Sequence, residues 1–151
     1  MPDLRRPEIS GGEIRLPLAP GARHDETTDL VLRQLADQLT PPDQVKKDAI
    51  VEAPSLGILR RPDLAVLGAS TDRPRLVVEV VSPHNPGTDH QARVRDYAAT
   101  GIPVHLLVDP RKGTGIIHDE PGYARRADFA FGDIITVGPW TLDTGVLRTY
   151  S

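Results

Sequence analysis

Residues 76–83 read LVVEVVSP and place one carboxylate, Glu79, in the middle of an aliphatic segment. A run this rich in valine is typical of a strand that is buried on both faces. An unpaired charge in such a place costs several kcal/mol, unless it is neutralised, paired or bound to a cation. The sequence therefore predicts that another part of the chain holds a partner for Glu79.

A second acid, Asp63, opens the apolar stretch PDLAVL at residues 62–67. If these residues and residues 75–81 form consecutive strands, Asp63 and Glu79 can meet on one face, because neighbouring strands lie about 4.8 Å apart. Two converging carboxylates repel each other unless a cation neutralises them. Hard oxygen ligands on a partly open site suit Mg²⁺ or Mn²⁺, which activate water and stabilise the charge that develops on a phosphodiester.

The elements around this pair predict an α/β fold with a mixed sheet flanked by helices, in the order α-β-β-β-α-β. Apolar residues at helical spacing indicate a helix over residues 25–39, and Thr88 with Gln91 forms a capping box that starts a second helix, ended by Gly101 and Pro103. Strands are predicted at residues 45–53, 62–67, 75–81 and 104–108, with a turn at 55–61. Extra strands are expected near both ends, in a hairpin at 9–18 and at 114–118, 134–137 and 140–142.

Composition limits the classes of protein that fit. The 151 residues suit one domain, residues 1–151, and the absence of cysteine excludes disulfides and thiolate metal sites. No apolar stretch approaches the roughly 18 residues of a membrane span, and the first residues lack a signal-peptide core, so we expect a soluble, cytoplasmic protein without a membrane partner. The net charge of −3 gives no global basic field to attract nucleic acid.

Several stretches together resemble the PD-(D/E)xK nuclease superfamily, and more specifically the bacterial Uma family of restriction-endonuclease-like proteins. They are RRPDLAVL, LVVEVVSP, the D-x-x-x-R-x-x-x-Y pattern of residues 89–97, AATGIPVHLLVDP and an early Glu-x-x-Gly segment at residues 8–11. The resemblance implies a restriction-endonuclease-like core and Mg²⁺- or Mn²⁺-dependent cleavage of DNA. By analogy it also implies a homodimer, because cutting both strands needs two sites.

The resemblance also assigns roles to residues. It implies that Asp63 and Glu79 are metal ligands, with the backbone carbonyl of Val80 as a third, and that the basic residue comes from the second helix as Arg93. The supporting residues that it suggests are His24, Glu26, Asp89 and Tyr97.

The chain departs from the superfamily at residue 81, where Val81 stands in place of the usual lysine. Arginine stays protonated and cannot act as a base, although Arg93 could clamp a phosphate and stabilise the transition state. Lys46 or Lys47, on the preceding predicted strand, is an alternative source of a lysine. The departure therefore bears more on catalysis than on metal or phosphate binding.

Each residue also has a simpler interpretation. Asp63 could only cap a turn, and Glu79 could form a structural ion pair with Arg75 or Arg61. Asp89 and Arg93 stand at the i, i+4 spacing of an ordinary helix salt bridge. The remaining residues have structural interpretations too: His24 as a helix cap, Glu26 as a surface acid favoured by the helix dipole, and Tyr97 as a core residue whose hydroxyl reaches the margin of the site.

Three hypotheses about function follow. The first is a metal-dependent DNA endonuclease, and the second is a catalytically weakened or inactive nuclease fold that binds nucleic acid or protein. The third is a hydrolase of a small phosphorylated molecule.

Overall fold

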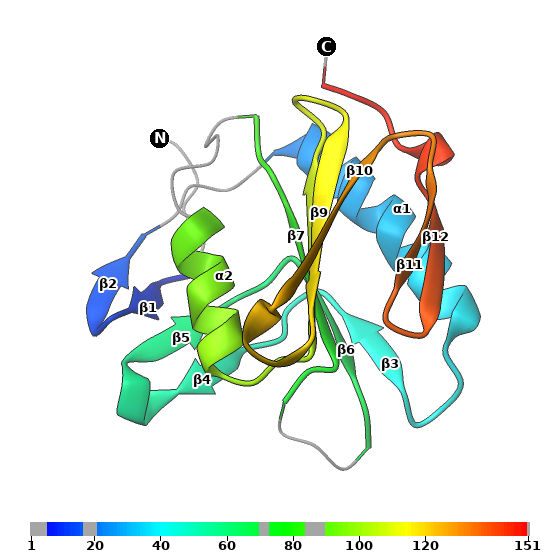
Figure 1. The fold of residues 1–151 in the computed structure, drawn as a ribbon. Helices are drawn as coiled ribbons and strands as arrows, with labels where there is room; N and C mark the ends of the chain where they lie inside the picture. The colour runs from blue at the N-terminus through cyan, green and yellow to red at the C-terminus, as the bar shows by residue number, and fades with distance from the viewer. Residues whose placement is uncertain (1–5, 17–20, 70–72, 84–89, 151) are drawn as a thin grey trace.

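A six-stranded mixed sheet forms the centre of the protein (Figure 1). The structure is a computed structural model and describes residues 6–16, 21–69, 73–83 and 90–150. Only β7 and β8 run parallel, and every other pair in this sheet is antiparallel. In spatial order, the strands are β10 (Arg125–Ala130), β9 (Thr114–Asp119), β8 (Val104–Asp109), β7 (Leu76–Val80), β6 (Leu64–Leu67) and β3 (Gln44–Lys46).

The two helices lie on opposite faces of this sheet (Figure 1). Helix α1 (Ala22–Gln38) buries Val31 and Leu35 against residues of β7 and β8 that include Val78 and Leu106. Helix α2 (His90–Ala99) connects β7 to β8 and buries Tyr97 in a second cluster with side chains from the other face of β6 and β7. Residues that alternate along β7 therefore point toward different helices, and Glu79 points toward α2.

Two smaller sheets flank the central one. Beside α2 lies a four-stranded sheet in the order β2 (Glu13–Arg15), β1 (Glu8–Ser10), β5 (Ile58–Arg60) and β4 (Val51–Ala53). A hairpin of β11 (Ile134–Val137) and β12 (Trp140–Asp143) packs against α1. Three short 3₁₀ turns complete the described elements: Pro54–Leu56, Pro121–Tyr123 and Thr144–Val146.

The sequence predicted the core of this arrangement. The α-β-β-β-α-β order, the parallel crossover through α2 and the N-terminal hairpin are all present. Helix α2 ends as predicted: Gly101 takes φ +77°, and the Gly101 and Ile102 amides donate back to the carbonyls of Ala98 and Tyr97. The predicted start at Thr88 lies outside the described residues.

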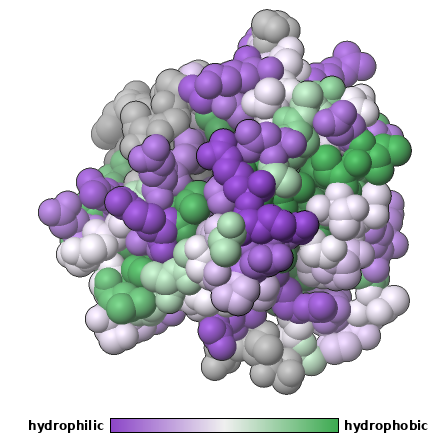
Figure 2. All heavy atoms as spheres, in the orientation of Figure 1, coloured by the Kyte–Doolittle hydropathy of each residue, from purple (hydrophilic) through white to green (hydrophobic). Residues whose placement is uncertain are grey.

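Three details of the prediction were wrong. Residues 45–53 form two strands in different sheets, because the exposed residues 46–48 carry the chain from β3 at the edge of the central sheet to β4. The predicted turn at 55–61 contains strand β5, because the turn itself covers only residues 54–57. Strand β10 was not predicted, because its sequence RRADFA buries only Phe129. Its other residues are exposed at the edge of the sheet, in the hydrophilic region across the centre of Figure 2.

A fully buried arginine ties the small sheet to α2. The side chain of Arg60 is 0% exposed; its Nε donates to Asp96 Oδ2 at 2.8 Å, and its Nη1 lies 3.4 Å from Glu8 Oε1. Ser10 Oγ donates to the same Asp96 oxygen at 2.9 Å. Strands β1 and β5 are therefore held to α2 by charge as well as by packing.

We expect Arg60→Met to lower the free energy of unfolding by about 3–5 kcal/mol, because Asp96 loses its buried cation and Glu8 keeps only Arg93 as a cationic partner. Urea denaturation followed by circular dichroism measures the loss. Arg61→Met is the matched control, since the neighbouring side chain is partly exposed and reaches only the Pro7 carbonyl. Equal losses in the two variants would contradict this account of Arg60.

Candidate active site

Asp63 and Glu79 meet on the α2 face of the central sheet. Strands β6 and β7 are antiparallel with Leu64 opposite Val78, which brings Asp63, the residue before Leu64, beside Glu79. Both side chains are buried, with Asp63 4% exposed and Glu79 3% exposed. The predicted convergence of the two acids on consecutive strands is therefore present in the fold.

Neighbouring groups fix the orientation of Asp63. Its Oδ2 accepts a hydrogen bond from the backbone amide of Val80 at 2.7 Å and lies 3.0 Å from His24 Nε2. The other ring nitrogen of His24 lies 3.2 Å from Asp25 Oδ1. His24 is buried in the first turn of α1, where its ring contacts Asp63; among the described residues, no side chain caps that helix, whose N-cap residue is Gly21.

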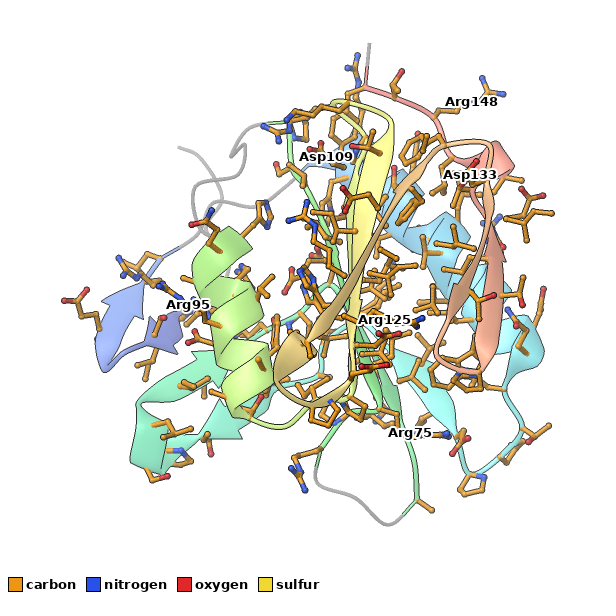
Figure 3. The ribbon with its side chains drawn as sticks, in the orientation of Figure 1. Arg75, Arg95, Asp109, Arg125, Asp133 and Arg148 are labelled. Atoms are coloured by element: carbon orange, nitrogen blue, oxygen red, sulfur yellow. The ribbon has the colours of Figure 1, made fainter. Side chains whose placement is uncertain are left out.

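Glu79 is paired with two residues of α2. Arg93 Nη1 donates to Glu79 Oε1 at 3.0 Å, and the Tyr97 hydroxyl donates to the same oxygen. The suggested partners Arg75 and Arg61 were wrong. Arg75 pairs with Asp43 at 2.7 Å and lies at the lower edge of the sheet in Figure 3.

Glu8 is the residue of the site that the sequence analysis missed. It is buried at the start of β1 and pairs with Arg93 through both guanidinium Nη atoms, at 3.2 Å from Nη1 to Oε2 and with a shorter contact from Nη2 to Oε1. The Arg61 amide also donates to Glu8 Oε2, at 2.5 Å. The Glu-x-x-Gly segment at residues 8–11 marked this region, but nothing local indicated that the acid faces Arg93.

The buried face of α2 carries a charged residue. Arg93 and Tyr97 are the buried residues of this helix, whereas Val94 and Ala98 are only partly buried. An arginine can occupy the buried face because two carboxylates, Glu8 and Glu79, compensate its charge. The result is a guanidinium bridge between the small sheet and the central sheet.

Burial and neighbouring charges shift the proton affinities of these groups. Burial raises the pKa of Glu79 from 4.5 to about 7, and the negative charge of Asp63 adds to the rise, while Arg93 and the Tyr97 hydrogen bond oppose it. The surrounding carboxylates hold the pKa of Arg93 well above its ordinary value, and burial does the same for the pKa of the Tyr97 phenol. At neutral pH, Arg93 is therefore a cation and Tyr97 is neutral.

Other predicted site residues lie elsewhere. Glu26 is exposed on α1, Lys46 is exposed on β3 and Lys47 pairs with Asp29, so none of them contacts the carboxylate pair. Val81 is 1% exposed in the core, and Asp89 lies outside the described residues.

The donor set limits which metal could bind. Within the described ranges, no three histidine, cysteine or acidic side chains are grouped as a metal-binding cluster. Asp63 and Glu79, with the Val80 carbonyl, offer hard oxygen atoms only. A site with few protein ligands suits an ion that keeps several water ligands, as Mg²⁺ and Mn²⁺ do.

The balance of acidic and basic groups in the site is compatible with a bound divalent cation. Among the described residues, four carboxylates lie around the guanidinium groups of Arg60 and Arg93, so acidic groups outnumber these two bases; they are Glu8, Asp63, Glu79 and Asp96. The raised pKa of Glu79 is one consequence of burying a carboxylate in this surplus. The donor set and the charge balance therefore fit Mg²⁺ or Mn²⁺.

Comparisons with known proteins agree with this architecture. The family model Uma2, described as "Putative restriction endonuclease", matches residues 1–143. The crystal structure of "a putative nuclease belonging to DUF820" from Anabaena variabilis is similar with a TM-score of 0.80 and 15% sequence identity, and the match covers 97% of this chain and 92% of that one. No curated protein matches the sequence significantly. In the described part of the chain, no helix is long and apolar enough to cross a membrane.

The raised pKa of Glu79 predicts a pH dependence of stability. Because the folded state binds this proton more tightly than the unfolded chain, the free energy of unfolding should fall as pH rises from 4.5 to about 7 and level off above that pH. Glu79→Gln cannot ionise, so the variant should gain stability relative to the wild type across this interval, by up to about 3 kcal/mol. Urea denaturation of both proteins at pH 5, 6, 7 and 8, without divalent cations, measures the difference; a constant difference would contradict the assignment.

Proposed function

The chain belongs to the Uma2 family, and on that basis we propose that it is a metal-dependent endonuclease that hydrolyses phosphodiester bonds in DNA. The observation that carries the proposal is the meeting of Asp63 and Glu79 at adjacent strand positions, with Asp63 held by the Val80 amide and His24. The fold that this chain shares, over nearly its whole length, with "a putative nuclease belonging to DUF820" from Anabaena variabilis supports the proposal.

We propose that Asp63 and Glu79, with the Val80 carbonyl, hold Mg²⁺ or Mn²⁺. When bound there, the ion would lower the pKa of a water ligand and neutralise charge on the phosphate. The protein residues prepare this site in advance. The Val80 amide and His24 keep Asp63 in one orientation, and Tyr97 and Arg93 do the same for Glu79.

The hydrogen bonds of Arg93 go to the acids of the site. Its guanidinium donors point to Glu8 and Glu79, so it positions Glu79 and reduces the repulsion between carboxylates. It cannot serve as a general base, because those acids keep its pKa well above the ordinary value. A direct contact of Arg93 with a phosphate stays a prediction.

A second candidate function is a weakened or inactive nuclease fold that binds nucleic acid or protein. Two observations favour it: Val81 is buried where the superfamily has its lysine, and the Arg93 guanidinium is already engaged by two carboxylates. Neither Lys46 nor Lys47 supplies the missing amine.

Metal-dependent cleavage tests the first proposal. We expect purified protein to nick plasmid DNA with Mn²⁺ or Mg²⁺ and to lose at least about 100-fold in rate in Asp63→Asn and Glu79→Gln. Calorimetry should show weaker Mn²⁺ binding in both variants. Glu26→Gln, an exposed acid on α1, is the matched control and should cleave like the wild type. Undiminished cleavage by a clean Glu79→Gln preparation would disprove the assignment.

Arg93→Lys distinguishes the two candidates. A lysine can hold a water and adjust its pKa, so a weakened nuclease should cleave faster after this substitution, although one amine spans Glu8 and Glu79 less well and stability should fall. Cleavage rates and Mn²⁺ affinities of both proteins are the measurements. If neither protein cleaves DNA or binds Mn²⁺, the binding-module interpretation replaces the nuclease.

A further inference from the structure

The C-terminal segment ends beside the strand that carries Glu79. The Tyr150 hydroxyl donates to the Val81 carbonyl at 2.5 Å, and its backbone amide donates to the Pro110 carbonyl at 3.0 Å. The Tyr150 carbonyl accepts a hydrogen bond from Arg23 in the first turn of α1. Tyr150 thus joins the end of β7, the turn after β8 and the start of α1, which lie at one end of the molecule in Figure 1.

The same three segments border the carboxylate pair. Val81 follows Val80, whose amide holds Asp63, and Arg23 precedes His24, whose ring contacts Asp63. Asp109, at the end of β8, lies at this end of the sheet in Figure 3. Tyr150 is therefore attached to the backbone that positions the candidate metal ligand, at a place beyond residue 143, where the family match ends.

The phenol is partly exposed and stays protonated. Burial raises the pKa of Tyr150 well above its ordinary value, and the negative charges of Asp63 and Asp109 add to the rise while Arg111 opposes it. The influence of Asp63 agrees with a position near the carboxylate pair. A neutral phenol beside a phosphodiester site can only donate its proton to the anion, and hydrogen bonds to charged acceptors are stronger than those to a neutral carbonyl.

We propose that Tyr150 is a substrate-binding residue of the candidate site: its hydroxyl leaves the Val81 carbonyl and donates to a non-bridging oxygen of the bound phosphodiester. Arg23 and the Pro110 carbonyl hold the main chain while the side chain changes partner. This inference rests on the proposed nuclease function. A purely structural role, in which Tyr150 only fastens the C-terminal segment, is the competing explanation.

The test compares Tyr150→Phe with the wild type. The variant keeps the ring and both main-chain contacts and removes only the hydroxyl. The probe is a fluorescent 20-base-pair DNA duplex in Ca²⁺, an ion chosen to support binding without cleavage, with affinity measured by anisotropy at a temperature where both proteins are fully folded. We expect binding to weaken by about tenfold or more, as for one hydrogen bond to a charged group. In Mn²⁺, KM for cleavage should rise while kcat changes little.

Tyr123→Phe is the matched control, because Tyr123 is a half-buried tyrosine in the 3₁₀ turn before β10 and should not affect DNA affinity. If Tyr150→Phe is less stable to heat but binds DNA with unchanged affinity, Tyr150 is only a structural fastener and the inference is overturned while the nuclease proposal stands. If the wild type neither binds nor cleaves DNA, the proposed function fails and the inference fails with it.

Discussion

The buried guanidinium of Arg93 is the interaction on which the site depends. It lies between Glu8 of the small sheet and Glu79 of the central sheet, and it comes from the helix that covers both acids. Removing a charge from water is expensive, so such a group is tolerated only when its partners are close and well aligned. The arrangement of β1, β7 and α2 follows from that requirement as much as from apolar packing. Arg60 is a second buried arginine with acidic partners, and it lies between Glu8 and Asp96.

This geometry changes the role of the arginine that stands in for a lysine. A lysine two residues after Glu79 would place a single amine beside the candidate metal ligands, whereas Val81 is in the core and Arg93 reaches the site from α2. Arg93 contributes a fixed positive charge that pairs with Glu79 and partly opposes the rise in its pKa that burial causes. Burial of Glu79 remains the larger influence, and the pKa of this acid is raised to about 7.

The sequence was sufficient for the features that depend on local pattern. The aliphatic run around Glu79 predicted a buried strand, its spacing from Asp63 predicted their meeting, and Gly101 marked the end of α2. The partner of Glu79 could not be read locally, because it depends on which helix residues face the sheet, and a charged residue was not expected on the buried face. Glu8 was missed for the same reason: its partner Arg93 is 85 residues away. Strand β10 was missed because an exposed edge strand shows little hydrophobic alternation.

That long separation has a consequence for how the protein folds. The contacts of β1 with α2 close loops of 85 and 86 residues, so they cost more chain entropy than the hairpins and the β7-α2-β8 crossover, which form from neighbouring segments. We expect the central sheet to form early and the N-terminal hairpin to dock late. Until this hairpin docks, Arg93 can pair with Glu79 but not with Glu8. We therefore expect docking of the N-terminal strand to complete the contacts of Arg93 after Asp63 and Glu79 have met in the central sheet.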